Sequence, residues 1–257
     1  MPSLVLTKSF KSDQPLKPIA RVSGGPRSLD GALLCCSDVP GDAAISLPHD
    51  AHMSPCEPTH DPAGRDCVYV AGPSGAGKST VARGFAERYR ALWPRRHIVL
   101  ISRLSDDDSL QVGGHVDIKR IRIESLVASP PEIDEFKQCL VIIDDVEGLP
   151  PKQAEAVQGL AETIGNLGRH TSTSLLYLTH MLTAGLKTRN LLGECQTYVI
   201  FPGGSSYNQL RHLLCYYAGA SPQDVTRIKR LPSRWVAVKR TYPQSVVYDG
   251  GAYLLNE

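Results

Sequence analysis

One nine-residue segment restricts the fold of this chain more than any other feature. Residues 72–80 read GPSGAGKST, which places glycine, glycine, lysine and serine at the spacing G-x-x-x-x-G-K-[ST]. The apolar run CVYVAG (67–72) just before it predicts a buried strand. Apolar residues recur every three or four positions from Val81 to Leu92 and predict a helix, which must end before Pro94. A strand, a glycine-rich turn and a helix in this order indicate an α/β protein.

The same segment has the chemistry of a phosphate-binding loop. Small residues let the backbone curl so that successive N–H groups point at one phosphate, and the start of the next helix adds a positive dipole end. Lys78 would reach the β- and γ-phosphates of ATP, and the Ser79 hydroxyl would bind Mg²⁺. The alternative is a glycine-rich turn that merely contains a lysine, and the four fixed positions argue against it. The expected nucleotide-binding residues are Gly72, Pro73, Ser74, Gly75, Ala76, Gly77, Lys78, Ser79 and Thr80.

The rest of the chain after Cys67 alternates predicted strands and helices, which is typical of a mostly parallel sheet between two helix layers. Pro151 suits the first turn of a helix, and Ser221 followed by Pro222 and Asp224 is a strong helix start. The DGG segment at 249–251 predicts a turn in a small C-terminal hairpin region. We expect further strands at 97–102, 120–126, 139–146, 174–180 and 197–203, and further helices at 206–219 and 221–231.

Proline divides the sequence into two regions. Nine of the 19 prolines lie in residues 1–66. We therefore expect 1–66 to be a Pro-rich N-terminal appendage, with one hairpin around KPIARVSGG and DGALLCC and a loose linker over 39–66. Residues 67–257 then form the nucleotide-binding domain with its C-terminal helices and hairpin.

Composition excludes several classes of protein. Lys and Arg total 28 against 26 acidic residues, and a net charge of +2 is too small to argue nucleic-acid binding by itself. No run of about 18 apolar residues predicts a membrane span, and the N-terminus lacks the pattern of a secretory signal. Only two of the seven cysteines are adjacent, Cys35 and Cys36, which favours free thiols in a reducing, intracellular compartment.

A second motif, LVIIDD at 140–145, has the features of a Walker B strand. Its apolar residues would bury the strand, and its end would emerge where ligands bind in open α/β sheets. Asp144 would then hold Mg²⁺, and Asp145 would polarise the attacking water. Glu147 is an alternative for Asp145, because aspartate is one methylene shorter than the more usual glutamate. A strand that ends in a solvated acidic turn is the structural alternative.

At least one strand, 97–102, separates the two motifs along the chain. Small-molecule kinases and GTPases tend to place the two motifs on neighbouring strands, whereas ATPases with an additional strand have the order seen here. The next strand ends in Thr179 and His180, where such ATPases keep a polar residue that senses the γ-phosphate. The alternative role for both residues is to cap a strand end.

Arginine from a neighbouring subunit can stabilise the charge that builds on the transferred phosphoryl group. Three arginines are candidates, in the order Arg189, Arg169 and Arg103. Arg189 ranks first because it follows the Thr179–His180 strand. Each of the three would otherwise be an ordinary surface residue.

Several segments together resemble P-loop ATPases of large double-stranded DNA viruses, which are related to FtsK/HerA-type genome-packaging ATPases. The segments are KPIARVSGG with DGALL, GPSGAGKST, ISRL, LVIIDD, GRH, LTH, TRNLL, VIFPGG and LPSRWVAVKRTYPQSVVYDGGAYLL. The resemblance covers about 15–35 and 67–255. It implies an additional-strand ATPase core, Mg-ATP as substrate, and a homo-oligomeric ring that acts on double-stranded DNA in the host cytoplasm, viral factory or virion. The phosphate, metal, water and sensor roles carry over to Lys78, Ser79, Asp144, Asp145 and His180.

A basic cluster near the C-terminus could follow a DNA backbone, with Trp235 and Tyr242 as stacking platforms. An ordinary solvated face is the alternative. Two other functions stay open: a guanylate-kinase-like nucleotide or small-molecule kinase, and a scaffold that binds ATP without hydrolysing it. The basic residues are Arg211, Arg227, Lys229, Arg230, Arg234, Lys239 and Arg240.

Overall fold

The computed structural model describes residues 2–10, 16–103 and 118–255 and shows an α/β fold. The chain divides into two compact units. One is Asp61–Cys195, and the other combines Met1–His60 with Gln196–Glu257. These boundaries differ from the expected division at residue 66, and the assignment of functional domains to 1–66 and 67–257 stays a prediction.

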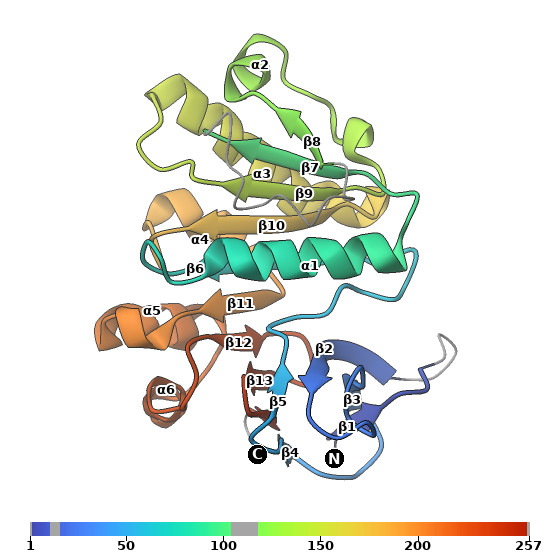
Figure 1. Cartoon of the computed structure of the whole chain (residues 1–257). Coiled ribbons are helices and arrows are strands. Elements are labelled where there is room, and N and C mark those ends of the chain that lie inside the picture. The colour runs from blue at the N-terminus through green and yellow to red at the C-terminus, as the bar shows by residue number, and fades with distance from the viewer. Residues whose placement is uncertain (1, 11–15, 104–117, 256–257) are drawn as a thin grey trace. The chain divides into compact units, whose positions relative to one another are not determined.

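Five parallel strands form the sheet of the unit Asp61–Cys195 (Figure 1), in the order β6-β10-β9-β7-β8. β10 is the last of the five strands along the chain, yet in the sheet it lies between β6 and β9. All residues of β6 and β9 are buried, which explains their continuous apolar sequences. The strands are β6 Cys67–Ala71, β7 Ile98–Ser102, β8 Ile118–Ile121, β9 Leu140–Asp144 and β10 Ser174–Thr179.

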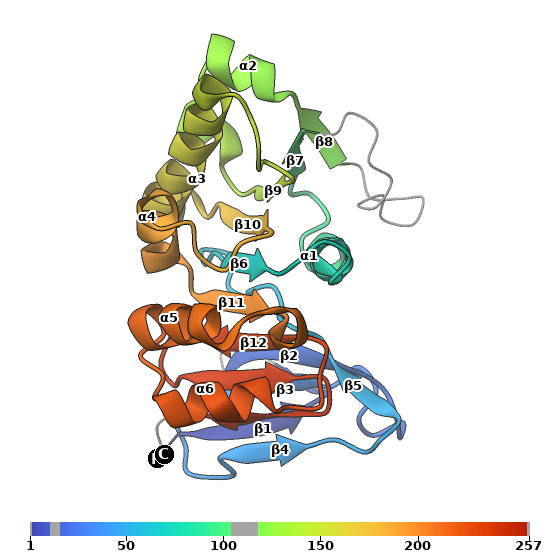
Figure 2. The ribbon, with the colours of Figure 1, turned by 90° about the vertical axis from the view of Figure 1, so that its left-hand side faces the viewer.

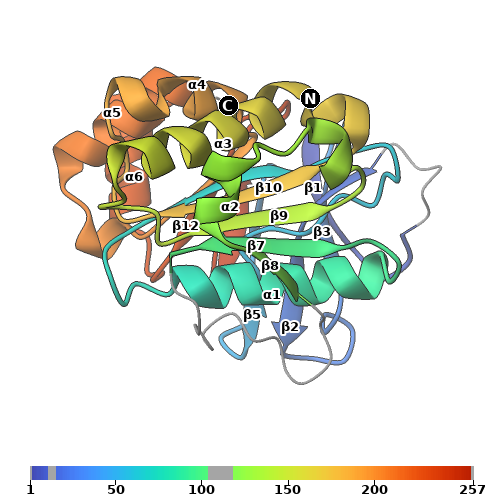
Figure 3. The same ribbon diagram turned by 90° about the horizontal axis from the view of Figure 1, so that it is seen from above.

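Helices cover both faces of this sheet, with α1 on one face and α3 on the other (Figures 2 and 3). α1 (Lys78–Leu92) buries Val81, Phe85 and Tyr89, as the periodicity predicts, and it ends before Pro94. α3 (Pro151–Thr171) starts at the expected proline. The other helices of the unit are α2 Ile123–Ala128, the 3₁₀ helix η2 Ile133–Phe136 and α4 Leu186–Glu194.

One expected strand, 120–126, is wrong in its second half. β8 ends at Ile121, and α2 begins at Ile123 after the extended residue Arg122. The alternation of arginine and isoleucine suggested a strand, but Ile123 and Leu126 are both buried at the three-residue spacing of a helix. The short helix α4 was not expected at all.

The second unit contains an antiparallel sheet in the order β1-β3-β2-β5. β2 and β3 cover the two segments for which the sequence predicts a hairpin. The expected loose linker over 39–66 contains two short strands, β4 and β5, because each finds a pairing partner far away in the sequence. The strands are β1 Ser3–Thr7, β2 Leu16–Gly24, β3 Leu33–Ser37, β4 Ala44–Ser46 and β5 Ala51–Met53.

The C-terminal strands of this unit pair antiparallel in the order β11-β12-β13-β14-β4, so residues from both ends of the chain share a sheet. The predicted turn at 249–251 leads from β13 into β14. Ser221 accepts a hydrogen bond from the Asp224 N–H, and Asp224 accepts one from the Ser221 N–H, which confirms the predicted helix start. The remaining elements are β11 Thr197–Ile200, η3 Pro202–Gly204, α5 Tyr207–Tyr217, α6 Pro222–Lys229, β12 Val236–Lys239, β13 Ser245–Tyr248 and β14 Gly251–Leu254.

Within the described ranges, no helix combines the length and the hydropathy that a membrane crossing requires.

Candidate nucleotide-binding site

Residues 72–80 link the carboxyl end of β6 to the start of α1. The Gly72 N–H donates to the Thr179 carbonyl at 3.1 Å, which fixes the loop against the end of β10. Gly75 and Gly77 have φ of 72° and 114°, where a side chain would add strain, so both positions require glycine. Gly77 caps α1 without a side chain, and the first turn contains no acidic residue. The positive end of α1 is therefore available to an anion.

Lys78 is buried, with 7% of its surface exposed. Its Nζ donates to the carbonyls of Gly72 at 2.9 Å and Pro73 at 3.2 Å, and it lies 3.1 Å from Nδ1 of His180. Because an ammonium group can only donate, Nδ1 must accept this hydrogen bond. A neutral His180 then carries its proton on Nε2.

Burial lowers the pKa of Lys78 below its usual value, since the charged form loses contact with water. Asp144, Glu147 and Asp145 act in the opposite direction and raise the pKa of the same group. Three carboxylates are therefore near enough to Lys78 to act on its charge. This places the acidic end of β9 in the electrostatic surroundings of the phosphate-binding loop.

Asp144 is the last residue of β9 and is 6% exposed. Its Oδ1 accepts the Asp145 N–H at 2.9 Å. Asp145 has φ of 51° and lies in the left-handed region, which is uncommon for a residue other than glycine. The chain therefore turns sharply at Asp145, just beyond the buried strand.

Glu147 joins this acidic loop to the end of β10. Its Oε1 accepts hydrogen bonds from the Thr179 hydroxyl and the His180 N–H, both at 2.6 Å. His180 Nε2 also lies 3.8 Å from Asp145 Oδ1. One ligand atom from each of Asp145, Glu147 and His180 falls within 4.8 Å of the others. The sequence offered Glu147 only as an alternative to Asp145, and nothing local in it reveals these contacts.

Two tyrosines support the end of β10 from within the sheet. Tyr69 on β6 and Tyr177 on β10 are register partners, and their rings stack with centroids 5.8 Å apart. The Tyr69 hydroxyl donates to the Met181 carbonyl at 3.1 Å and so holds the segment that follows His180. Burial raises the pKa of Tyr177 to about 12, and Glu147 adds to this increase.

The donor set fits the expected Mg²⁺ ion. Ser79 contributes a hydroxyl from the first turn of α1, and Asp144 contributes a carboxylate from the end of β9. Hydroxyl and carboxylate oxygens are ligands that Mg²⁺ prefers. Asp144 also acts on the charge of Lys78, the residue next to Ser79 in the sequence, which places it electrostatically near the start of α1.

The three candidate arginines lie at different places in the unit Asp61–Cys195. Arg189 is exposed on α4. Arg169 is exposed in the last turn of α3, which leads to the amino end of β10, whereas the phosphate-binding loop lies at the carboxyl ends of the strands. Arg103 follows β7, and its Nη1 lies 3.7 Å from the point where a Cβ on Gly148 would stand. Among the residues that the structure describes, none of the three forms a hydrogen bond or ion pair with Lys78 or Asp145.

Several residues of the C-terminal basic cluster have contacts inside their own unit. Lys229 Nζ donates to the carbonyls of Pro202 at 2.7 Å and Ser205 at 2.5 Å. The Arg227 guanidinium lies 3.6 Å from the centroid of the Tyr253 ring. These contacts give both side chains a structural role, which the sequence alone does not indicate.

No family model matches the chain. It is similar to protein V3 of the Sputnik virophage, with 26% identity over 242 residues that cover 93% of this chain and 96% of the relative. Its fold is also similar to the cytoplasmic domain of the Type VII secretion ATPase EccC of Thermomonospora curvata, with a TM-score of 0.50, 17% identity, and coverage of 74% of this chain and 25% of that one. B204, the DNA-packaging ATPase of Sulfolobus turreted icosahedral virus, gives a TM-score of 0.48 and 14% identity, over 76% of this chain and 99% of that one. The chain is therefore similar in sequence to a virophage protein, and it shares its α/β fold with the cytoplasmic domain of the ATPase EccC.

Proposed function

We propose that this chain is a P-loop ATPase that hydrolyses Mg-ATP and uses the energy to move double-stranded DNA, as in viral genome packaging. The main support is the insertion of β10 between β6 and β9. This order lets Thr179 at the end of β10 contact the acidic loop and lets His180, the next residue, contact Lys78. It also disfavours the kinase alternative, in which the two motif-bearing strands tend to be neighbours.

In the proposed reaction, water attacks the γ-phosphorus of ATP while the bond to the β–γ bridging oxygen breaks, giving ADP and inorganic phosphate. Asp145 orients the water and takes its proton. Residues 72–80 hold the phosphates, and Lys78 neutralises their growing charge. Mg²⁺ would be held by Ser79 and Asp144, and when bound it neutralises phosphate charge.

Thr179 and His180 act as the sensor in this proposal. His180 lies between Lys78 and Asp145, so a change at the γ-phosphate would alter its contacts on both sides. Thr179 holds Glu147, which makes Glu147 a positioning residue for the acidic loop. An arginine from a neighbouring copy in a homo-oligomeric ring would complete the site, with Arg189 as first candidate and Arg169 as second.

Double-stranded DNA is proposed as the partner because of the resemblance in the motifs quoted above. The C-terminal basic residues Arg211, Arg230 and Arg234 are exposed and remain candidates for phosphate contacts. Lys229 and Arg227 contribute less to such a surface, since their charged ends already have partners.

The test is the rate of phosphate release from ATP, with and without linear double-stranded DNA, for the parent and for Lys78→Ala. We expect a Lys78-dependent rate that DNA increases, in a protein whose solution mass exceeds that of one chain. Lys152→Ala is the control, because Lys152 is exposed on α3 and has no role in the proposed chemistry. An equal rate in Lys78→Ala would reject the proposal.

The same assay separates the alternatives. A kinase would release ADP only when a nucleoside monophosphate is added. A scaffold would bind ATP in a Lys78-dependent way while hydrolysis stayed at background.

A further inference from the structure

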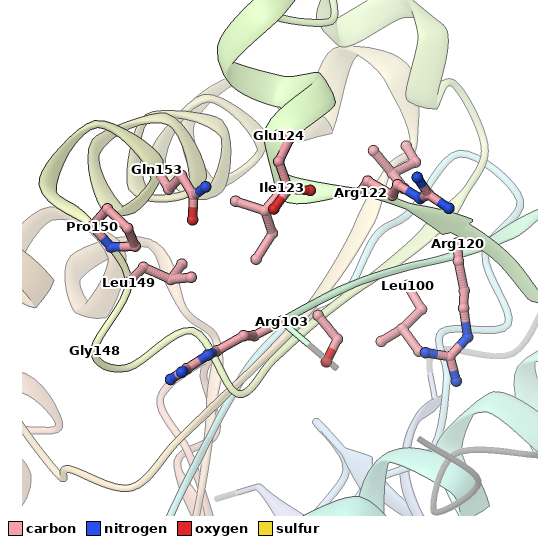
Figure 4. Close-up of a pocket in the computed structure, with 12 residues that line it drawn as sticks. Leu100, Arg103, Arg120, Arg122, Ile123, Glu124, Gly148, Leu149, Pro150 and Gln153 are labelled. Carbon is pink, nitrogen blue, oxygen red and sulfur yellow. The ribbon is translucent and has the colours of Figure 1, made fainter. Parts of the chain in front are cut away.

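A cavity of about 1030 Å³ lies in the unit Asp61–Cys195 at the carboxyl ends of β7 and β8 (Figure 4). One wall comes from the segment between β9 and α3, and another from the start of α2. Figure 4 shows Gln153 and Leu149 on one side, Ile123 and Glu124 on another, and the guanidinium groups of the arginines at separate points around the space. The lining residues are Leu100, Ser102, Arg103, Arg120, Ile121, Arg122, Ile123, Glu124, Gly148, Leu149, Pro150 and Gln153.

The charge of this cavity is mainly positive. Arg103, Arg120 and Arg122 line it, against one acidic residue, Glu124. Arg103 and Arg122 form no ion pair with any other residue that the structure describes. Their charges are therefore available to an anionic ligand.

We propose that this cavity binds the sugar-phosphate backbone of the DNA on which the ATPase acts. Guanidinium groups bind phosphate oxygens through paired hydrogen bonds, and they do so better than ammonium groups. The cavity is much larger than one phosphate needs, and the arginines surround it instead of meeting at one point, so a chain of phosphates suits it better than a single anion. The half-buried apolar side chains of Ile121 and Leu149 provide a surface for the sugars.

The position of the cavity links it to the proposed catalytic site. Gly148, Leu149 and Pro150 form its wall and directly follow Glu147 in the chain. Arg103 Nη1 also approaches the Gly148 backbone. A strand bound here would press on the acidic loop, so DNA would change the rate of hydrolysis. This last step rests on the proposed ATPase function, whereas the binding of DNA does not.

The test uses the full chain, a fluorescein-labelled DNA duplex without nucleotide, and a series of salt concentrations. In the double variant Arg120→Gln/Arg122→Gln we expect DNA binding to weaken about tenfold or more. The slope of the logarithm of the binding constant against the logarithm of the salt concentration should become smaller in magnitude by about 1.8, because two phosphate contacts are lost. Lys119→Gln is the matched control. Lys119 is exposed on the same strand but does not line the cavity, so its loss should leave the slope unchanged.

A second variant tests the proposal independently, in case the double variant does not fold. Gln153→Glu adds a negative charge to the cavity from the first turn of α3, where the helix dipole favours it, and it should also weaken DNA binding. Parent-like DNA binding in both variants would overturn the proposal. Displacement of the duplex by inorganic phosphate or by a mononucleotide at the same phosphate concentration would also overturn it.

The ATPase rate separates this proposal from the proposed function. A Lys78-dependent ATPase rate that survives in the double variant, but no longer responds to DNA, supports both proposals. A Lys78-independent rate with arginine-dependent DNA binding rejects the ATPase proposal alone.

Discussion

The contact between Thr179 and Glu147 gives the sharpest test of the site geometry. Thr179→Val keeps the shape of a side chain that is 6% exposed, so it opens no cavity. It removes the 2.6 Å hydrogen bond to the Glu147 carboxylate and the acceptor of the Met181 N–H at 3.2 Å. A hydrogen bond to a charged group contributes about 1.5–3 kcal/mol, so we expect the free energy of unfolding to fall by that amount. At about 2–4 °C per kcal/mol, the melting temperature should fall by about 3–12 °C.

Urea unfolding gives the stability of Thr179→Val, and phosphate release with ATP titration gives its activity. If Thr179 positions the acidic loop, kcat should fall about tenfold or more while the affinity for ATP stays near that of the parent, since 1.4 kcal/mol corresponds to a factor of ten. Thr163→Val is the control, because its hydroxyl bonds only to the Gly159 carbonyl within α3. A stability within about 0.5 kcal/mol of the parent would refute the reasoning, since surface changes alone produce effects of this size.

Three further predictions concern charge and backbone strain. Burial lowers the pKa of Lys78 below its usual 10.5, so between the folded-state pKa and 10.5 the unfolded chain binds more protons than the folded chain. The free energy of unfolding of the parent should therefore rise with pH in this range. Urea unfolding at several pH values should show that Lys78→Met lacks this rise. Asp145→Gly should increase the unfolding free energy by about 1 kcal/mol by relieving the φ of 51°, yet abolish ATP hydrolysis. Lys229→Met should lower stability by about 1–3 kcal/mol, because it removes the charged donor that bonds to the Pro202 and Ser205 carbonyls, while DNA affinity across a salt series stays unchanged.

The α/β core was largely predictable because its signals are local. The glycine-rich loop at 72–80, the apolar runs of β6 and β9, and the Pro151 start of α3 can each be recognised from a few adjacent residues. The chain order of the motifs also favours an ATPase with an additional strand, and the structure places β10 between β6 and β9. The second half of the expected strand at 120–126 was wrong because alternation over so few residues does not separate a strand from a short helix.

The organisation of the other unit was not predictable in this way. β4 pairs with β14, although their sequences lie about 200 residues apart, and β5 pairs with β2. Short strands of three or four residues have almost no local signal, so proline and glycine around them suggested a loose linker. Pairing over such distances depends on the complete fold, which is why residues 1–60 and 196–257 form one compact unit.

The site shows the same limit at the level of single side chains. Sequence motifs indicate Lys78, Asp145 and His180 one at a time. No motif indicates that His180 contacts both other residues or that Glu147 accepts the His180 N–H. This connection exists because β10 lies between the two strands, so residues at its end reach both. In the proposed ATPase, a change at the γ-phosphate would pass through the end of β10. Substitutions at Thr179 or His180 should therefore uncouple nucleotide binding from hydrolysis, whereas substitutions in the loop at 72–80 should remove both.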